Sequence, residues 1–416
     1  MNSKKFLAFT MAAAMTLSLA ACGGNGGSAS SAGGSSASAS AGDTTGTASG
    51  NFVKEVVDPT GAAFKIGATG PLTGDASIYG LAAYRGAQIA VNEINSEGGD
   101  IQFELNYQDD QNVPETAVNA FNNLKDWGMQ ISLGSVTTQP GIATSQYNFE
   151  DRIFALTPSA SSPDVIANKD NVFQMCFSDP NQGLASAQYI SEQNLGENVY
   201  IIWKNDDVYS TGIKDQFVAE AEELGLNIVG DSTFTTDTSN DFTVQLTDAQ
   251  QKGADLVFLP MYYQPASLIL TQADSMGYEP KFFGVDGMDG ILTMEGFDAS
   301  LAEGVMLLTP FNADATDDAT VAFVTEYESL YGETPNQFAA DAYDCIYALK
   351  LALETAGCTP DMTAEAINDA LIAAFPTITL TGLTGDGEGI TWDSTGAVSK
   401  APKGMVIENG AYVGMD

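Results

Sequence analysis

The chain has 416 residues, with 15 lysines and arginines against 54 aspartates and glutamates, and it contains no histidine. Its net charge of −39 repels nucleic acid and anionic lipid headgroups, so we expect neither as a partner of the folded body. The lack of histidine excludes Ser-His-Asp and Cys-His catalysis and histidine-ligated zinc, and we expect no metal and no cofactor.

The first 51 residues predict a targeting segment followed by a tether. Two lysines precede an apolar run that is too short to cross a bilayer comfortably, which is typical of a signal peptide over residues 1–21. The ending Leu-Ala-Ala-Cys resembles the bacterial lipoprotein signal, in which the cysteine, here Cys22, is lipidated; an ordinary cleavage site beside a cysteine is the alternative. Residues 22–51 are rich in Gly, Ser and Ala, cannot build a core, and predict a flexible tether.

From residue 64 onward, short apolar runs alternate with stretches of helical periodicity. The expected strands lie at 64–70, 101–107, 129–135, 153–159, 198–206, 254–262, 281–286 and 304–311. Expected helices lie at 79–99, 114–128, 139–151, 211–225 and 266–277, and the stretch 187–196 is expected to end a further helix. A mainly helical region at 317–375 follows, with two hairpin-like pieces after it. Strands separated by such helices predict parallel sheets covered on both faces, and a body of this length exceeds one core. We therefore expect an α/β fold with two doubly wound lobes.

Three cysteines follow Cys22. Cys345 lies within a predicted helix and Cys358 just past its end, too far apart along a helix for a disulfide. Cys176 lies in an apolar, strand-like run. We expect all three to be buried small hydrophobic residues; one disulfide is the alternative.

Four polar loops follow predicted strands: GPLTGDASIYG, GSVTTQPG, TPSASSPDV and GVDGMDG. In parallel sheets such loops form the ligand site. Ser161 or Ser162 could cap a helix that starts at Pro163, and the free N–H groups of that helix would attract a carboxylate. Ser135 adds a hydroxyl, and Asp286 is the single acidic group able to hold an ammonium. Together they suit a zwitterion, although ordinary turn chemistry explains each loop alone.

These loops carry a family resemblance. The segments KIGATGPLTGDASIYGLAAYRGAQIAVNEIN, GSVTTQP, LTPSASSPDV, MYYQP and GVDG occur in this order and resemble the leucine/isoleucine/valine-type substrate-binding proteins of ABC importers. The resemblance covers essentially the whole chain from residue 64. It implies a type I periplasmic binding protein fold with a three-stranded hinge near residues 178–180, 310–312 and 401–403. The N-terminal lobe would then comprise residues 52–179 plus 312–402, and the C-terminal lobe residues 180–311 plus 403–416.

The resemblance also implies roles for single residues. The Ser135 hydroxyl and the Ser161 backbone N–H would hold the ligand carboxylate, while Asp286 would close on the ammonium from the second lobe. The carbonyl of Ser159 or Ala160 and the Ser161 hydroxyl would also accept from the ammonium, and the matching aromatic positions are Tyr79, Tyr262 and Tyr209. The family's leucine binders typically carry Glu in place of Asp286 and Thr in place of Ser161, so the resemblance indicates a zwitterion without fixing its side chain.

The expected function is that of a monomeric, extracytoplasmic solute-binding lipoprotein without enzymatic activity. Anchored by Cys22 to the outer face of a bacterial cell membrane, it would capture an amino acid, branched-chain or similarly apolar, by lobe closure and deliver it to an ABC permease. Alternative ligands are a short amide, a urea-like compound or an aromatic acid. Alternative classes are a lipid-anchored hydrolase using Ser with Lys or an acid pair, and a structural or adhesive surface lipoprotein.

Overall fold

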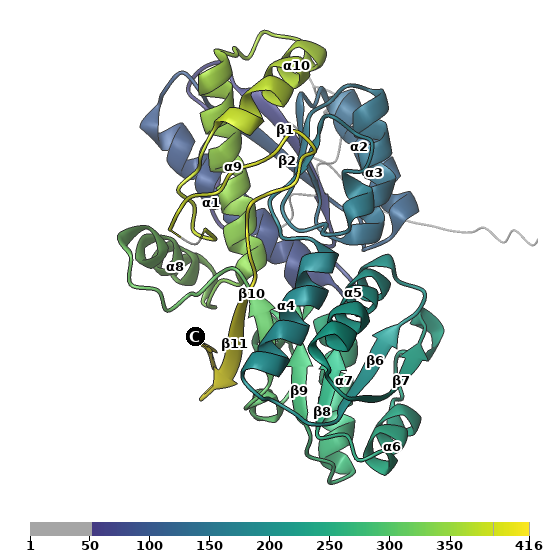
Figure 1. Cartoon of the computed structure of the whole chain (residues 1–416). Helices are drawn as coiled ribbons and strands as arrows, with labels where there is room; N and C mark the ends of the chain where they lie inside the picture. Colours follow the sequence, from purple (N-terminus) through teal and green to yellow (C-terminus); the bar gives the residue numbers. More distant parts are fainter. Residues whose placement is uncertain (1–51, 386, 416) are drawn as a thin grey trace, which may run out of the picture. The chain divides into compact units, whose positions relative to one another are not determined.

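The computed structural model describes residues 52–385 and 387–415, which belong to one compact unit. The predicted signal peptide, Cys22 and the whole of the predicted tether (residues 22–51) lie outside the described residues. Within the described ranges, no helix is both long enough and apolar enough to cross a membrane. Two separate sheets organise the fold, and each forms the centre of one lobe (Figure 1).

The first lobe contains a fully parallel five-stranded sheet in the order β2-β1-β3-β4-β5. Its strands are β1 Phe64–Gly70, β2 Phe103–Asp109, β3 Ile131–Ser135, β4 Ala155–Thr157 and β5 Val172–Gln174. The helices between them are α1 Ser77–Glu97, α2 Pro114–Trp127 and α3 Thr138–Glu150. The residues of the central strands β1 and β3 are mostly buried, on both faces of the sheet, as in other parallel sheets.

The second lobe contains a seven-stranded sheet in the order β12-β11-β10-β9-β8-β6-β7. Its strands are β6 Val199–Lys204, β7 Ile228–Phe234, β8 Leu256–Leu259, β9 Lys281–Gly284, β10 Met306–Thr309, β11 Lys403–Glu408 and β12 Ala411–Gly414. The covering helices are α4 Asp179–Glu192, α5 Val208–Leu224, α6 Thr243–Gln251 and α7 Tyr263–Ser275. β11 and β12 pair antiparallel across an Asn409-Gly410 turn, in which both residues have positive φ, as a tight hairpin demands.

After β10 the chain returns to the first lobe. The helices of this return are α8 Asp318–Tyr331, α9 Gln337–Ala356 and α10 Ala364–Ala374, and α9 lies alongside α1 (Figure 1). The chain then enters the second sheet again as β11, paired to β10. The two sheet-centred lobes, between which the chain passes and returns, confirm the predicted fold class. The residues at which the chain passes between the lobes remain a prediction.

The helix predicted to start at Pro163 is wrong in extent. The segment after Ser162 forms only a single 3-10 turn, η1 Pro163–Val165, with the Ser162 hydroxyl accepting from the Asp164 N–H at 3.3 Å. Asn168 has a positive φ of 59° close after it, and β5 begins at Val172, so no room remains for a helix. The three cysteines after Cys22 are buried and unpaired in the described part of the chain.

Candidate functional site

The candidate site lies where strand ends of both sheets face each other. In the first lobe its residues follow the carboxyl ends of β1, β3 and β4, and in the second lobe they follow β6, β8 and β9. This is the expected location of a ligand in open parallel sheets. A small pocket at this place is lined by Tyr79, Val136, Thr137, Thr138, Ser159, Ser161, Tyr209, Tyr262, Asp286, Gly287 and Phe338. The structure therefore brings together six of the eight predicted ligand-binding residues.

Asp286 provides the acid of the site. It opens the single turn η3 Asp286–Met288 after β9, and its side chain is 3 % exposed. Its Oδ1 accepts a hydrogen bond of 2.5 Å from the Tyr209 hydroxyl, which in turn accepts from the Gly287 N–H at 2.9 Å. Burial raises the pKa of Asp286 to about 7, against the opposing effect of the Tyr209 and Gln182 hydrogen bonds. The site thus holds a carboxyl that a nearby cation would keep ionised.

Tyr79 links the two lobes across the pocket. It lies near the start of α1, and its hydroxyl donates to the Gly287 carbonyl and accepts from the Tyr263 N–H at 3.1 Å. Its ring packs against Tyr262 and Phe338 with centroid distances of 5.2 and 4.4 Å. The aromatic rings form an apolar wall beside the polar groups.

The serine and threonine hydroxyls that line the pocket belong to the first lobe. Thr137 precedes α3 and makes no side-chain capping hydrogen bond, and Thr138 is the first residue of this helix. Both hydroxyls and that of Ser161 are buried without a hydrogen-bond partner among the described residues. Buried hydroxyls are normally paired, so these three atoms are available to a ligand. The N-terminus of the 13-residue helix α3 adds a positive end, which the short turn at Pro163 does not.

Ser135 does not line the pocket. It is 1 % exposed at the end of β3, and its Oγ lies 2.7 Å from the Thr69 hydroxyl and 3.0 Å from the Thr144 hydroxyl. Its predicted contact with a ligand carboxylate remains a prediction. The neighbouring Thr137 and Thr138 hold the free hydroxyls instead.

Ser159 and Ala160 differ in the use of their polar groups. The Ala160 carbonyl accepts from the Gln174 side chain at 2.6 Å, and Ala160 does not line the pocket. Ser159 lines the pocket, with its own hydroxyl donating to the Val136 carbonyl at 2.5 Å. Of the two predicted carbonyl acceptors, Ser159 is therefore the better placed.

Phe338 is a site residue that sequence reasoning missed. It is the second residue of α9, after Asn336, whose side chain caps the helix by accepting from the Ala339 N–H at 3.3 Å. Nothing in the local sequence connects this position with the pocket loops, which lie about 50 to 260 residues earlier in the chain. The capping residue before an apolar helix start was the only local signal.

The pocket is nearly closed in this conformation, with a volume of about 10 Å³. A cavity of this size holds at most about one water molecule. A larger cavity of about 580 Å³ adjoins it at Tyr262 and is lined by both lobes, including Gln139 and Lys204. The Gln139 side chain bridges the lobes by donating to the Asp206 carbonyl at 3.1 Å. A solute must therefore enter while the lobes or the pocket side chains are moved apart.

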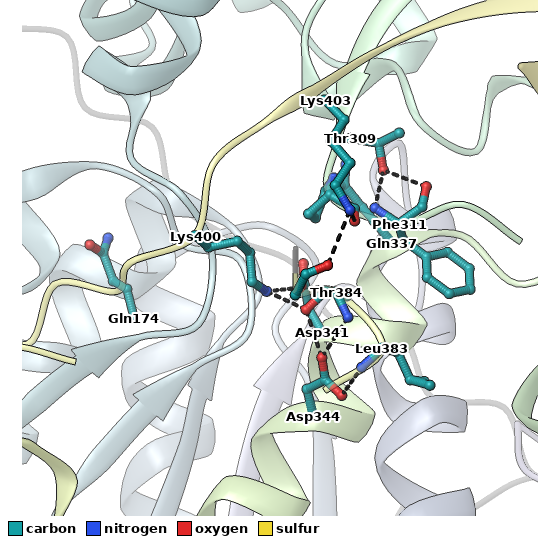
Figure 2. Close-up of polar contacts among 12 residues, drawn as sticks. Gln174, Thr309, Phe311, Gln337, Asp341, Asp344, Leu383, Thr384, Lys400 and Lys403 are labelled. Carbon is teal, nitrogen blue, oxygen red and sulfur yellow. Dashed lines mark hydrogen bonds and ion pairs between the residues drawn. The ribbon is translucent and has the colours of Figure 1, made fainter. Parts of the chain in front are cut away.

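A buried charged network lies next to the predicted third hinge segment. Lys400 Nζ, with 1 % of the side chain exposed, donates to Asp341 at 2.6 Å and also to the Thr384 hydroxyl (Figure 2). Asp344 accepts from the Leu383 and Thr384 N–H groups at 2.9 and 3.0 Å. Burial raises the pKa of Asp341 to about 6, although Lys400 opposes the shift. The network fixes the chain immediately before it enters β11.

Relatives of this chain are amino-acid-binding proteins by name. A Leu/Ile/Val-binding protein homolog of Brucella melitensis is 27 % identical over 84 % of this chain and 93 % of its own length. A leucine-, isoleucine-, valine-, threonine- and alanine-binding protein of Pseudomonas aeruginosa is 26 % identical over 73 % of this chain and 81 % of its own. These relatives confirm the resemblance to the leucine/isoleucine/valine type.

Solved structures agree with the fold. The branched-chain amino acid binding protein LivJ of Streptococcus pneumoniae, in complex with isoleucine, is 27 % identical, with a TM-score of 0.76 over 84 % of this chain and 97 % of that one. A benzoate complex of a solute-binding protein from R. palustris shares the fold at 20 % identity and a TM-score of 0.74, over 85 % of this chain and 95 % of that one. The family model described as periplasmic binding protein matches residues 63–400, and the chain belongs to this family.

Proposed function

We propose that this protein captures an amino acid between its two lobes and hands it to an ABC permease. The observation that carries the proposal is the division of polar groups across one pocket. Three unpartnered hydroxyls and the start of α3 lie on the first lobe, and the buried acid Asp286 lies on the second. A ligand that satisfies both sides needs an anionic end and a cationic end.

Each end of a zwitterion finds suitable groups. The carboxylate would lie at the α3 N-terminus and accept from the Thr137 and Thr138 hydroxyls. The ammonium would donate to Asp286, to the Ser161 hydroxyl and to the Ser159 carbonyl. Ligand held by the first lobe would then favour closure only through the additional contacts made by Asp286 and its neighbours.

The aromatic wall indicates the ligand's side chain. Tyr79, Tyr262 and Phe338 offer an apolar surface and little room, which suits a small or branched aliphatic group. The relatives named for leucine, isoleucine and valine support the same class. The absence of histidine and the non-enzymatic names of the relatives support a binding role without catalysis.

An aromatic carboxylic acid is the second candidate, because the pocket has an aromatic wall and a benzoate-binding protein shares the fold. A benzoate would leave Asp286 buried without a cation, which is unfavourable. A calorimetric screen of the purified body against leucine, isoleucine, valine, short amides and benzoate separates these ligands. We expect binding of at least one of the three amino acids. Binding of benzoate alone would overturn the proposal.

The location of the protein is part of the proposal. The signal-like segment and Cys22 support lipid attachment on the extracytoplasmic face, where a monomeric binding protein could meet its permease. We expect Cys22→Ser to release the protein from the membrane fraction while its affinity for solute stays unchanged. Continued fractionation with membranes would contradict lipid attachment.

A further inference from the structure

The described chain begins with a segment that is held against the side of α1. We call this segment, residues 52–60, the strap; it forms neither helix nor strand. Asn92 of α1 accepts from the Val57 N–H at 2.8 Å and donates to the Glu55 carbonyl at 3.1 Å, so its side-chain amide pairs with the strap as a parallel strand would. Asn95 donates to the Val57 carbonyl at 2.8 Å. Two buried amides of a core helix are therefore used to hold a peripheral piece of chain.

The strap runs along α1 in the direction of the second lobe. Its end near β1 is fixed by Gln102, which lies just past α1 and accepts from the Thr60 N–H at 2.6 Å. Its other end is fixed at Phe52, whose carbonyl accepts from Arg85 Nε at 3.2 Å. The distance from Glu97, the last residue of α1, back to Arg85 is about 18 Å along the helix axis. The strap therefore moves the start of the described chain by about this distance along the first lobe.

Arg85 lies at the seam between the two lobes. It lines a cavity of about 350 Å³ together with Tyr263 and Met294 of the second lobe. The first turn of α1 also meets the second lobe, since the Tyr79 hydroxyl donates to the Gly287 carbonyl. The strap thus begins beside both lobes, whereas β1, to which it leads, starts at the opposite end of the first lobe, away from the site.

We propose that the strap brings the origin of the predicted tether to the seam, so that an anchored molecule presents both lobes equally to the membrane and its permease. Without the strap, the chain would leave the body beside Gln102, at the far end of the first lobe, and the second lobe would be held away from the membrane. A permease that responds to the closed form must contact both lobes, because closure changes their relative position. This inference rests on the proposed lipid attachment and delivery, and it adds the orientation in which the solute is presented.

The length of the predicted tether makes its origin important. A Gly/Ser-rich tether over residues 22–51 would span about 30 Å on average. A shift of about 18 Å in its origin is a large part of this span, so it decides which parts of the body reach the membrane. Release of the strap would also add residues 52–60 to the tether. The strap is therefore expected to affect the orientation of the body and not its affinity for a solute.

The test measures how close each lobe comes to a membrane. The lipidated full chain is reconstituted in phosphatidylcholine vesicles that carry an acceptor dye on some headgroups, and a donor dye is attached at Glu150→Cys or at Glu223→Cys. Both positions are exposed, at the ends of α3 and α5 that lead to the starts of β4 and β7, so they mark the far ends of the first and second lobes. The three cysteines after Cys22 are buried, which directs the dye to the introduced thiol. With the strap intact, we expect similar energy transfer from the two donors.

The double variant Arg85→Ala with Asn92→Ala releases the strap. Energy transfer from the Glu150→Cys donor should then exceed that from the Glu223→Cys donor about twofold or more, because the tether now starts at the far end of the first lobe. Amide hydrogen exchange of the strap should be faster than in the wild type. The affinity for whichever of leucine, isoleucine and valine binds the wild type should be unchanged, because neither substituted residue lines the pocket.

Two further variants keep the test decisive. Glu333→Gln is a matched control, because it removes the ion pair of Arg85 but none of the hydrogen bonds to the strap, and it should behave as the wild type. If the double variant does not fold, Val57→Pro takes its place, since it removes the strap N–H that Asn92 accepts and lies outside the core.

The outcomes separate this inference from the proposed function. Unequal transfer in the wild type, equal transfer after release, or exchange of the wild-type strap as fast as that of the released strap would overturn this inference alone. A full chain that does not attach to vesicles would overturn the proposed lipid attachment and this inference with it. A wild type that binds none of leucine, isoleucine and valine would overturn the proposed ligand and leave the orientation result standing.

Discussion

The Asp286→Asn variant isolates the charge of the acid in the pocket. Asparagine preserves the size of the side chain and an oxygen that can still accept from Tyr209, so the network to the Gly287 N–H can persist. Alanine would instead leave the Tyr209 hydroxyl without this acceptor. The loss of affinity measured for Asp286→Asn therefore reports the contribution of the negative charge opposite the ligand's ammonium.

The expected magnitude follows from the environment of the carboxyl. A hydrogen bond to a charged group contributes about 1.5–3 kcal/mol, which corresponds to about a 10- to 150-fold increase in Kd. Burial raises the pKa of Asp286 to about 7, so about half of the empty sites in the closed conformation are neutral at pH 7. The full difference between the wild type and Asp286→Asn should therefore appear at pH 8.

Titration calorimetry at pH 8, with whichever of leucine, isoleucine and valine binds the wild type most tightly, measures the effect. Asp289→Asn is a matched control, because Asp289 is buried in the same loop but accepts from the Gln337 N–H at 2.9 Å and does not line the pocket. We expect the control to retain its affinity. A wild-type affinity in Asp286→Asn, with the control also unchanged, would show that the ammonium does not meet this acid.

The pH dependence, the closure and the buried ion pair provide three more tests. Amino-acid affinity should fall about tenfold from pH 8 to pH 6, since a carboxyl of pKa about 7 loses most of its charge over this interval, and Asp286→Asn should make the titration curve shallower. Tyr79→Phe should weaken binding by about 1–3 kcal/mol, because the closed state then lacks the hydrogen bond from the Tyr79 hydroxyl to the Gly287 carbonyl of the other lobe. Small-angle scattering of this variant with ligand should show a larger fraction of open molecules than for the wild type. Lys400→Met should lower the free energy of unfolding by about 3–5 kcal/mol at pH 8, because it leaves Asp341 charged and unpaired in the interior. This loss should be smaller at pH 5, where Asp341 folds in its neutral form, and urea titrations at both pH values measure it.

Most of the fold could be predicted because buried parallel strands have a strong sequence signal. The runs at β1, β6 and β8 are apolar and buried, and their spacing by helices is regular. β7 Ile228–Phe234 was missed because it is an edge strand, whose half-exposed residues include polar side chains such as Asp231. The adjacent helix α6 was missed for a similar reason, since only two of its residues are buried.

The position of Ser135 illustrates the limit of reading a site from a motif. Gly134 has a φ of 72°, and the register between β1 and β3 shifts at this level. A Cβ on Gly134 would lie 2.9 Å from the Thr157 side chain, so the tight approach requires glycine. The usual alternation of side chains is broken there, and the sequence cannot show which hydroxyl of this loop reaches the pocket. Phe338 could not be predicted either, because its contact with Tyr79 joins distant parts of the chain.

The buried acids also explain why closure should depend on the ligand. The rise in the pKa of Asp286 from 3.8 to about 7 means that burying the charged carboxyl costs about 4 kcal/mol of free energy. In the empty protein above pH 7 this burial disfavours the closed state, since opening would let water solvate the carboxyl. An ammonium between the lobes removes the penalty and adds attraction, whereas a neutral or anionic solute does neither. The free energy that favours the closed state therefore comes largely from the same charge that identifies the ligand, so selectivity and closure are two consequences of one buried carboxyl.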